Sequence, residues 1–186
     1  RKGSVVVNVD TSAIVDYAVE AVGGRVIRSK VGDPYVLEAM MKHRSVAGGE
    51  TCGAWIFPDI SLCPDGVLSS IVFLNLLEEG AMKPSEARAG LPGLVLRRRK
   101  VPCPIQAKRT LVEKLEAEIR YRYREEETLS VDGIRVGFSD KSWVLVRPSG
   151  TEPAIRITAE SQNEKKTLGL IDEFIKLIEA IKRGRI

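Results

Sequence analysis

Apolar residues in the first part of the chain alternate between strand and helix spacing. Residues 5–9 form a β-branched run typical of a strand, and apolar residues then recur every three to four positions between Ile14 and Val22. The same order of strand and helix returns over residues 25–43 and again over residues 45–77. This repeated order predicts a layered α/β domain with a mostly parallel sheet.

The alternation stops at a segment rich in proline and glycine, residues 80–104. Beyond it the pattern predicts one helix, four consecutive strands and a long final helix with a broad apolar face. Asp132-Gly133 is predicted as a two-residue hairpin turn between two of these strands. The order is typical of an α+β domain with an antiparallel sheet. We therefore predict an α/β domain over residues 1–96, a linker over 97–106 and a smaller α+β domain over 107–186.

Composition excludes several classes of protein. The chain is 44% hydrophobic and 29% charged, which is typical of a soluble globular protein. It has no apolar run approaching the roughly 20 residues of a membrane span and no signal segment, so the expected location is cytoplasmic and no membrane partner is expected. Three irregularly spaced cysteines favour free, buried thiols over a metal or redox pair. The one histidine, His43, lies in a predicted helix between Lys42 and Arg44 and has no evident catalytic partner, so no Ser-His-Asp arrangement is expected.

The motif RPSGTEP directly follows a predicted strand. Arg147 would be presented from the end of that strand, and its planar guanidinium can bind two oxygens of a phosphate or carboxylate. Ser149 and Thr151 add hydroxyl groups, and Gly150 lets backbone N–H groups approach an anion. An ordinary turn between strands explains the same residues, so both interpretations stand at this point.

Two further loops carry candidate binding residues. Residues 48–53 place three glycines around Glu50, which predicts a sharply bent loop that offers an acceptor to sugar hydroxyls or, alternatively, a simple tight turn. Asp33 follows Gly32 at a predicted strand-to-helix loop, where it can cap the helix or face a ligand. Glu152 has the wrong sign to touch a phosphate, so we expect it to orient Arg147 or Arg156, or to face solvent.

A basic run at residues 97–100, with arginines and tyrosines interleaved at 120–124, suggests nucleic-acid binding. Glutamates precede and follow the second group, and the net charge is only +4. Charge runs of this kind are usually solvated, so a nucleic-acid partner is not favoured.

Taken together, the motifs resemble those of a known family. RPSGTEP at 147–153, GGETCG at 48–53, VGDPYV at 31–36 and PDG at 64–66 occur in the order found in the C-terminal half of the α-D-phosphohexomutases. The resemblance covers essentially the whole chain. The VGD form and the double glycine before Glu50 are similar to those of phosphoglucosamine mutases and archaeal phosphomannomutase-type enzymes.

The resemblance implies the third and fourth domains of a four-domain enzyme. In that family a phosphoserine of the first domain exchanges a phosphoryl group with a hexose phosphate through a hexose bisphosphate, and the second domain binds Mg²⁺. The third domain contacts the sugar, and the fourth holds the phosphate that does not react. By position, the phosphate residues would be Arg147, Ser149, Gly150 and Thr151, with Arg156 as a further candidate; the sugar residues would be Glu50 and Cys52, and the specificity loop would hold Gly32 and Asp33.

The sequence departs from the family pattern in ways that limit this expectation. Cys52 and Ala54 replace the serine and histidine of many members, so the identity of the hexose stays open. The phosphoserine and metal loops are not in the chain, and residue 1 directly precedes a strand, so we expect a fragment that is inactive without its N-terminal half. Two alternatives stay open: a non-catalytic module that binds an acidic partner or nucleic acid, and a stand-alone regulatory protein.

Overall fold

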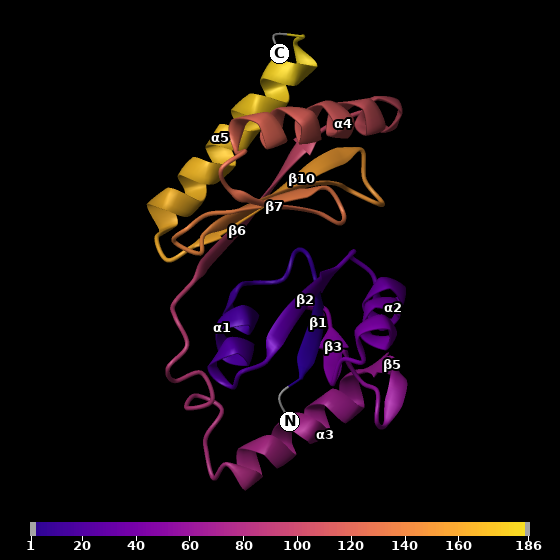
Figure 1. Cartoon of the computed structure of the whole chain (residues 1–186), viewed down its shortest axis with the longest axis vertical. Helices are drawn as coiled ribbons and strands as arrows, with labels where there is room; N and C mark the ends of the chain where they lie inside the picture. The colour runs from indigo at the N-terminus through magenta and orange to yellow at the C-terminus, as the bar shows by residue number, and fades with distance from the viewer. Residues whose placement is uncertain (1–2, 185–186) are drawn as a thin grey trace. The chain divides into compact units, whose positions relative to one another are not determined.

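The computed structural model describes residues 3–184, which form two units (Figure 1). The first unit comprises residues 1–92 and the second residues 93–186. Each has its own sheet of five strands and its own buried apolar cluster. Within residues 3–184, no helix is long and apolar enough to cross a membrane.

The first unit is a layered α/β domain, as predicted. The strand order is β2-β1-β3-β4-β5; β1 pairs in parallel with β2 and β3, and β4 and β5 extend the sheet in antiparallel pairs. The sheet is therefore mixed, with its parallel part at β2-β1-β3. Its elements are β1 (Ser4–Asn8), α1 (Ile14–Ala21), β2 (Arg25–Ser29), α2 (Asp33–His43), β3 (Ala47–Gly49), β4 (Trp55–Phe57), β5 (Ser61–Asp65) and α3 (Gly66–Glu79).

The two glycines before Glu50 lie in strand β3 and not in a bent loop, which corrects the prediction. A Cβ atom added at Gly48 would stand 2.3 Å from the sulfur of Met40, and one added at Gly49 would stand 2.4 Å from Cδ1 of Trp55. Met40 belongs to the buried cluster beneath α2. The glycines therefore provide space for close packing of α2 and β4 against β3.

Helix α3 begins at Gly66, the last residue of the PDG motif at 64–66. Asp65 is its N-cap, and its carboxylate accepts a hydrogen bond from the backbone N–H of Leu68 at 2.9 Å. The preceding strand β5 was not predicted. It contains Pro64 and lies at the edge of the sheet, where a missing N–H interrupts no pairing on the outer side.

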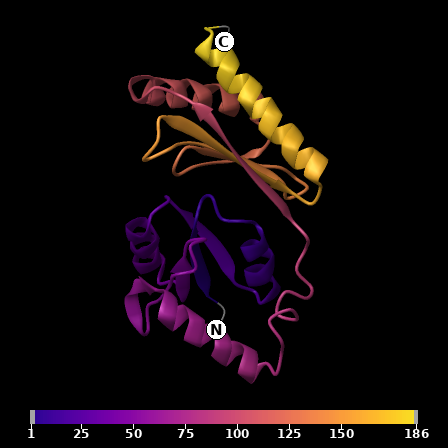
Figure 2. The ribbon, with the colours of Figure 1, turned by 180° about the vertical axis from the view of Figure 1, so that it is seen from behind.

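The second unit is an α+β domain with an antiparallel sheet, again as predicted. The strand order is β6-β10-β9-β8-β7, and every pair is antiparallel. Helices α4 and α5 pack on one face of this sheet around Phe174 and a large apolar cluster (Figure 2). Its elements are β6 (Val95–Pro102), α4 (Ile105–Arg122), β7 (Glu127–Ser130), β8 (Ile134–Gly137), β9 (Trp143–Pro148), β10 (Ala154–Ser161) and α5 (Glu164–Lys182).

Two sequence predictions for this unit are wrong in detail. Residues 97–106, predicted as a linker, hold most of β6 and the start of α4, and the division between the units falls at residues 92 and 93. The β7–β8 connection is longer than the predicted two residues, because Ser130 pairs with Ile134 and residues 131–133 join the strands. Gly133 adopts a positive φ of 85°, the left-handed conformation that three-residue hairpin loops favour at this place.

Candidate functional site

Glu50 lies at the carboxyl ends of three neighbouring strands in the first unit. Its Oε1 atom accepts a hydrogen bond from the side-chain amide of Asn8 at 2.6 Å and one from the backbone N–H of Gly32 at 2.8 Å. Asn8 ends β1, Gly32 follows β2, and Glu50 follows β3. The two loops singled out in the sequence thus meet at this edge, which is where open α/β sheets bind ligands.

The other two candidates in these loops have different surroundings from those predicted. Asp33 does not cap α2: it is the first helical residue, and the N-cap is Gly32, whose φ is 127°. A carboxylate in the first turn still interacts favourably with the helix dipole. Cys52 is exposed with a free thiol, as is Cys63, so the prediction of buried thiols holds only for Cys103.

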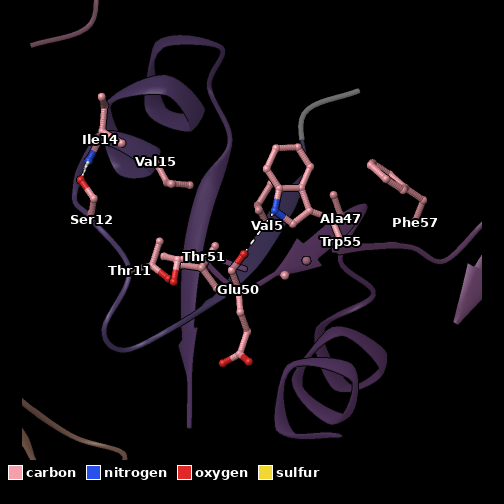
Figure 3. A pocket seen from close by; sticks show the side chains of 13 residues that line it. Val5, Thr11, Ser12, Ile14, Val15, Ala47, Glu50, Thr51, Trp55 and Phe57 are labelled. Carbon is pink, nitrogen blue, oxygen red and sulfur yellow. Dashed lines mark hydrogen bonds between the residues drawn. The ribbon is translucent and has the colours of Figure 1, made fainter. Parts of the chain in front are cut away.

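A cavity of about 400 Å³ opens beside Glu50, and sequence reasoning missed it (Figure 3). Apolar side chains such as Val7, Val15 and Phe57 form its walls. The backbone carbonyl of Glu50 accepts a hydrogen bond from the indole of Trp55, while its carboxylate points away from that indole (Figure 3). A polar ligand is therefore better suited to the carboxylate side of Glu50, where Asn8 and the Gly32 N–H lie, than to this apolar cavity.

Asn8 organises this edge, and replacing it by aspartate should expose its role. Its Oδ1 accepts hydrogen bonds from the Asp10 N–H and the Thr11 hydroxyl, and its amide donates to Glu50. Asn8→Asp would place two carboxylates in contact, so the pair should hold a proton at a pH where an isolated carboxyl is ionised. We expect a stability deficit that grows by about 1.4 to 2.7 kcal/mol from pH 4 to pH 7, measured by urea denaturation.

The matched control for this prediction is Asn8→Ala. It removes the donor to Glu50 without adding a charge, so it should destabilise the unit by an amount that is nearly independent of pH. A pH-independent deficit in Asn8→Asp would contradict the contact between the two side chains.

A row of cationic residues crosses the sheet of the second unit. Lys100 of β6 is opposite Arg156 of β10, and Arg156 is opposite Arg147 of β9. Directly opposed residues project from the same face of a sheet, and their neighbours Val101, Ile155 and Val146 lie in the core under the helices. The row therefore lies on the face opposite α4 and α5, beside the loop of residues 149–153.

Arg147 is buried and oriented by Asp132, a residue that the sequence analysis assigned only to a turn. The carboxylate of Asp132 accepts from Nε of Arg147 at 3.0 Å and pairs with Nη2 at 2.8 Å. These contacts use one edge of the guanidinium, and the group carries five N–H donors in all. Donors thus remain on a guanidinium whose orientation is fixed.

The carboxylate of Glu152 joins Lys100 and Arg156 of the row. It lies 2.7 Å from the ammonium of Lys100 and 2.9 Å from Nη2 of Arg156. The hydrogen bond from Lys100, followed by that from Arg156, lowers the pKa of this carboxyl below its usual value. The structure thus selects Arg156 among the partners expected for Glu152 and adds Lys100.

Ser149 is almost fully buried, at 2% exposure. Its hydroxyl oxygen accepts from the N–H of Glu152 and from Nε of Arg156, both at 3.2 Å. The loop tip is different: Gly150 and Thr151 are exposed, and within residues 3–184 their backbone N–H groups have no hydrogen-bond acceptor. Ser149 therefore shapes the loop, and the tip offers N–H donors beside the cationic row, an arrangement suited to an anion.

The basic run at residues 97–100 lies on the edge strand β6. Arg97 pairs with Glu164 and Lys100 pairs with Glu152, which reduces the charge available to an acidic partner. Lysine and arginine on an edge strand also oppose pairing with other chains. The residues that the structure describes contain no group of three or more His, Cys, Asp or Glu that could hold a metal ion.

Two family descriptions match the two units. Residues 1–93 match "Phosphoglucomutase/phosphomannomutase, alpha/beta/alpha domain III", and residues 100–177 match the C-terminal domain of the same family. The chain belongs to the phosphoglucomutase/phosphomannomutase family. It corresponds to the third and C-terminal domains of that family, as the motifs indicated.

Similar curated proteins are named as probable phosphoglucosamine mutases. The protein of Methanopyrus kandleri is 44% identical over 176 residues, which cover 95% of this chain and 38% of the relative. The protein of Methanosarcina acetivorans is 42% identical over 181 residues, which cover 97% of this chain and 38% of the relative. The chain thus spans about 38% of the length of these relatives.

Solved structures share the fold at low sequence identity. A phosphoglucomutase/phosphomannomutase family protein from Burkholderia thailandensis has a TM-score of 0.81 at 24% identity, covering 98% of this chain and 38% of that one. An Aspergillus fumigatus N-acetylphosphoglucosamine mutase, solved with GlcNAc-6P and magnesium, has a TM-score of 0.61 at 16% identity. The match covers 97% of this chain and 41% of that one. Both support the assignment of the fold.

Proposed function

We propose that this chain is the substrate-binding half of a phosphohexomutase that moves a phosphoryl group between positions 1 and 6 of a hexose through a hexose bisphosphate. The observation that carries the proposal is the exposed tip of the loop at Gly150 and Thr151, which adjoins the row of Lys100, Arg156 and Arg147. This loop would hold the phosphate that does not react. Phosphoryl transfer depends mainly on positioning and electrostatics, which such a loop supplies.

In this proposal the first unit contacts the sugar. Glu50 would accept hydrogen bonds from sugar hydroxyls, because its carboxylate lies at the carboxyl ends of β1, β2 and β3 and is held in place by Asn8 and Gly32. Cys52 and Asp33 would border the same site, with Asp33 and Gly32 in the loop that selects the hexose. The names of the archaeal relatives favour a glucosamine phosphate.

The chemistry would require residues outside this chain. A phosphoserine and a Mg²⁺ site of the N-terminal half would supply the phosphoryl group and the metal, as the family resemblance implies. The chain alone would then bind hexose phosphate weakly and be inactive. An enzyme of sugar-phosphate metabolism would act in the cytoplasm.

The proposal predicts a localised response to sugar phosphates. Titration of the ¹⁵N-labelled chain with glucosamine 6-phosphate should shift the amide signals of Gly150 and Thr151, with a dissociation constant on the order of 1 mM because a few charge-assisted contacts act without the rest of the cleft. Glucosamine without phosphate is the control and should leave these signals in place. Shifts confined to distant residues would contradict the phosphate loop.

The same labelled chain distinguishes the proposed function from the alternative, a module that binds an acidic partner or nucleic acid. A single-stranded oligonucleotide that shifted the signals of β6 in a salt-sensitive way, without competition from glucosamine 6-phosphate, would favour that alternative.

A further inference from the structure

Lys108 lies outside the RPSGTEP motif and links the two ends of the phosphate loop, residues 149–153. It lies near the start of α4, and its ammonium donates to the carbonyl oxygen of Ser149 at 2.6 Å and to that of Glu152 at 2.8 Å. These residues are 41 and 44 positions away in the sequence. One partly buried side chain therefore spans the loop on the side of the helices.

The bond to Ser149 also fixes the direction of a neighbouring donor. In a trans peptide the C=O of one residue and the N–H of the next lie in one plane and point in opposite directions, and the structure has no cis peptide bond among its described residues. The carbonyl of Ser149 points to Lys108, so the N–H of Gly150 points away from α4. This N–H is one of the two exposed donors at the loop tip.

Lys108 acts on the backbone, unlike the other contacts of this loop. Arg156 and the N–H of Glu152 both bond the Ser149 side chain, and the N–H of Ser149 bonds the carbonyl of Ala154. None of these contacts sets the plane of the Ser149–Gly150 peptide bond from the carbonyl side. A positive charge at this carbonyl also polarises the peptide group and strengthens the opposite N–H as a donor.

We propose that Lys108 is a positioning residue of the phosphate loop: it holds the Ser149–Gly150 peptide so that the Gly150 N–H faces the bound phosphate, without touching that phosphate itself. This inference rests on the proposed function of the loop. Without Lys108 the peptide can rotate, and the loop presents its donor for only part of the time. If the competent state falls to about one tenth, the apparent dissociation constant rises about tenfold.

The test compares Lys108→Met with Lys114→Met, an exposed lysine on the same helix. The ¹⁵N order parameter of Gly150, measured without ligand, should fall from the value of a rigid backbone, about 0.85, to below about 0.6 in Lys108→Met. The dissociation constant for inorganic phosphate should rise about tenfold in the same variant. Lys114→Met should change neither quantity, and Lys108→Gln, a second variant without the charge, should behave as Lys108→Met.

The two measurements separate this inference from the proposed function. If the wild-type loop does not respond to phosphate, the proposed function fails. A lower order parameter of Gly150 in Lys108→Met would still show that Lys108 holds the loop in place. An unchanged order parameter overturns the positioning role, whether or not affinity falls. A mobile loop with unchanged phosphate affinity overturns it as well.

Discussion

Replacing Gly133 by alanine should lower the free energy of unfolding of the second unit by about 2 to 5 kcal/mol. A positive φ of 85° costs an L-residue about 1–2 kcal/mol. The new Cβ would also stand 2.2 Å from the carbonyl oxygen of Val146 and 2.7 Å from Cα of Arg147. Both are backbone atoms of β9, so the strand itself must move, at a cost typical of overpacking, about 1–3 kcal/mol.

Urea denaturation of this variant can be followed in the second unit alone. The chain has two tryptophans, Trp55 in the first unit and Trp143 in the second. In a Trp55→Phe background, fluorescence therefore reports on β9. Gly184→Ala is the matched control, because Gly184 has a positive φ of 66° and, apart from its chain neighbours, no atom of residues 3–184 lies within 4 Å of the added Cβ. If Gly133→Ala and Gly184→Ala lowered the free energy of unfolding equally, the contact of the added Cβ with β9 would contribute nothing to the loss.

The parts of the fold that the sequence predicted are those with strong periodic patterns. The apolar face of α5 and the strands of residues 128–159 were recognised because burial on one face repeats at a fixed spacing. The failures are at the sheet edges, in β5 and β6. Each of these strands contains a proline, Pro64 or Pro102, and proline is ordinarily a signal for a loop, although edge strands tolerate it.

The candidate site was predictable only where its residues are adjacent in the sequence. RPSGTEP names Arg147 and the loop tip, but Asp132 and Lys108 reach this loop from 15 and 41 positions away. Asp132 could have been suspected from its place in a turn next to the strand of Arg147. For Lys108 no local pattern exists, because a lysine on a helix is ordinarily a solvated residue.

Glycine shows a second limit of sequence reasoning. Gly48 was assigned to a bend, although its role is to leave room for Met40, while Gly133 does provide a left-handed conformation. A glycine that provides space and one that provides conformational freedom are identical in the sequence. The packing partner distinguishes them, and that partner comes from the tertiary structure.

Replacing Arg147 by lysine should raise the dissociation constant of the chain for phosphate by about 10- to 100-fold, although the charge is kept. The guanidinium can bind Asp132 with one edge and still offer N–H donors to an anion. The single ammonium of lysine cannot reproduce this geometry, so at least one charge-assisted hydrogen bond of about 1.5 to 3 kcal/mol is lost. The measurement is titration with inorganic phosphate, followed at the amides of Gly150 and Thr151.

Asp132→Asn is the variant that makes this result interpretable. It keeps a side-chain oxygen near Nε of Arg147 but removes a negative charge beside the cationic row. Phosphate affinity should therefore stay the same or increase, because the field at the loop becomes more positive. If Arg147→Lys bound phosphate as tightly as the wild type, the positive charge of residue 147 alone would account for its contribution to phosphate affinity. If Asp132→Asn lost affinity instead, the orientation of the guanidinium by Asp132 would matter more than the repulsion between Asp132 and the anion.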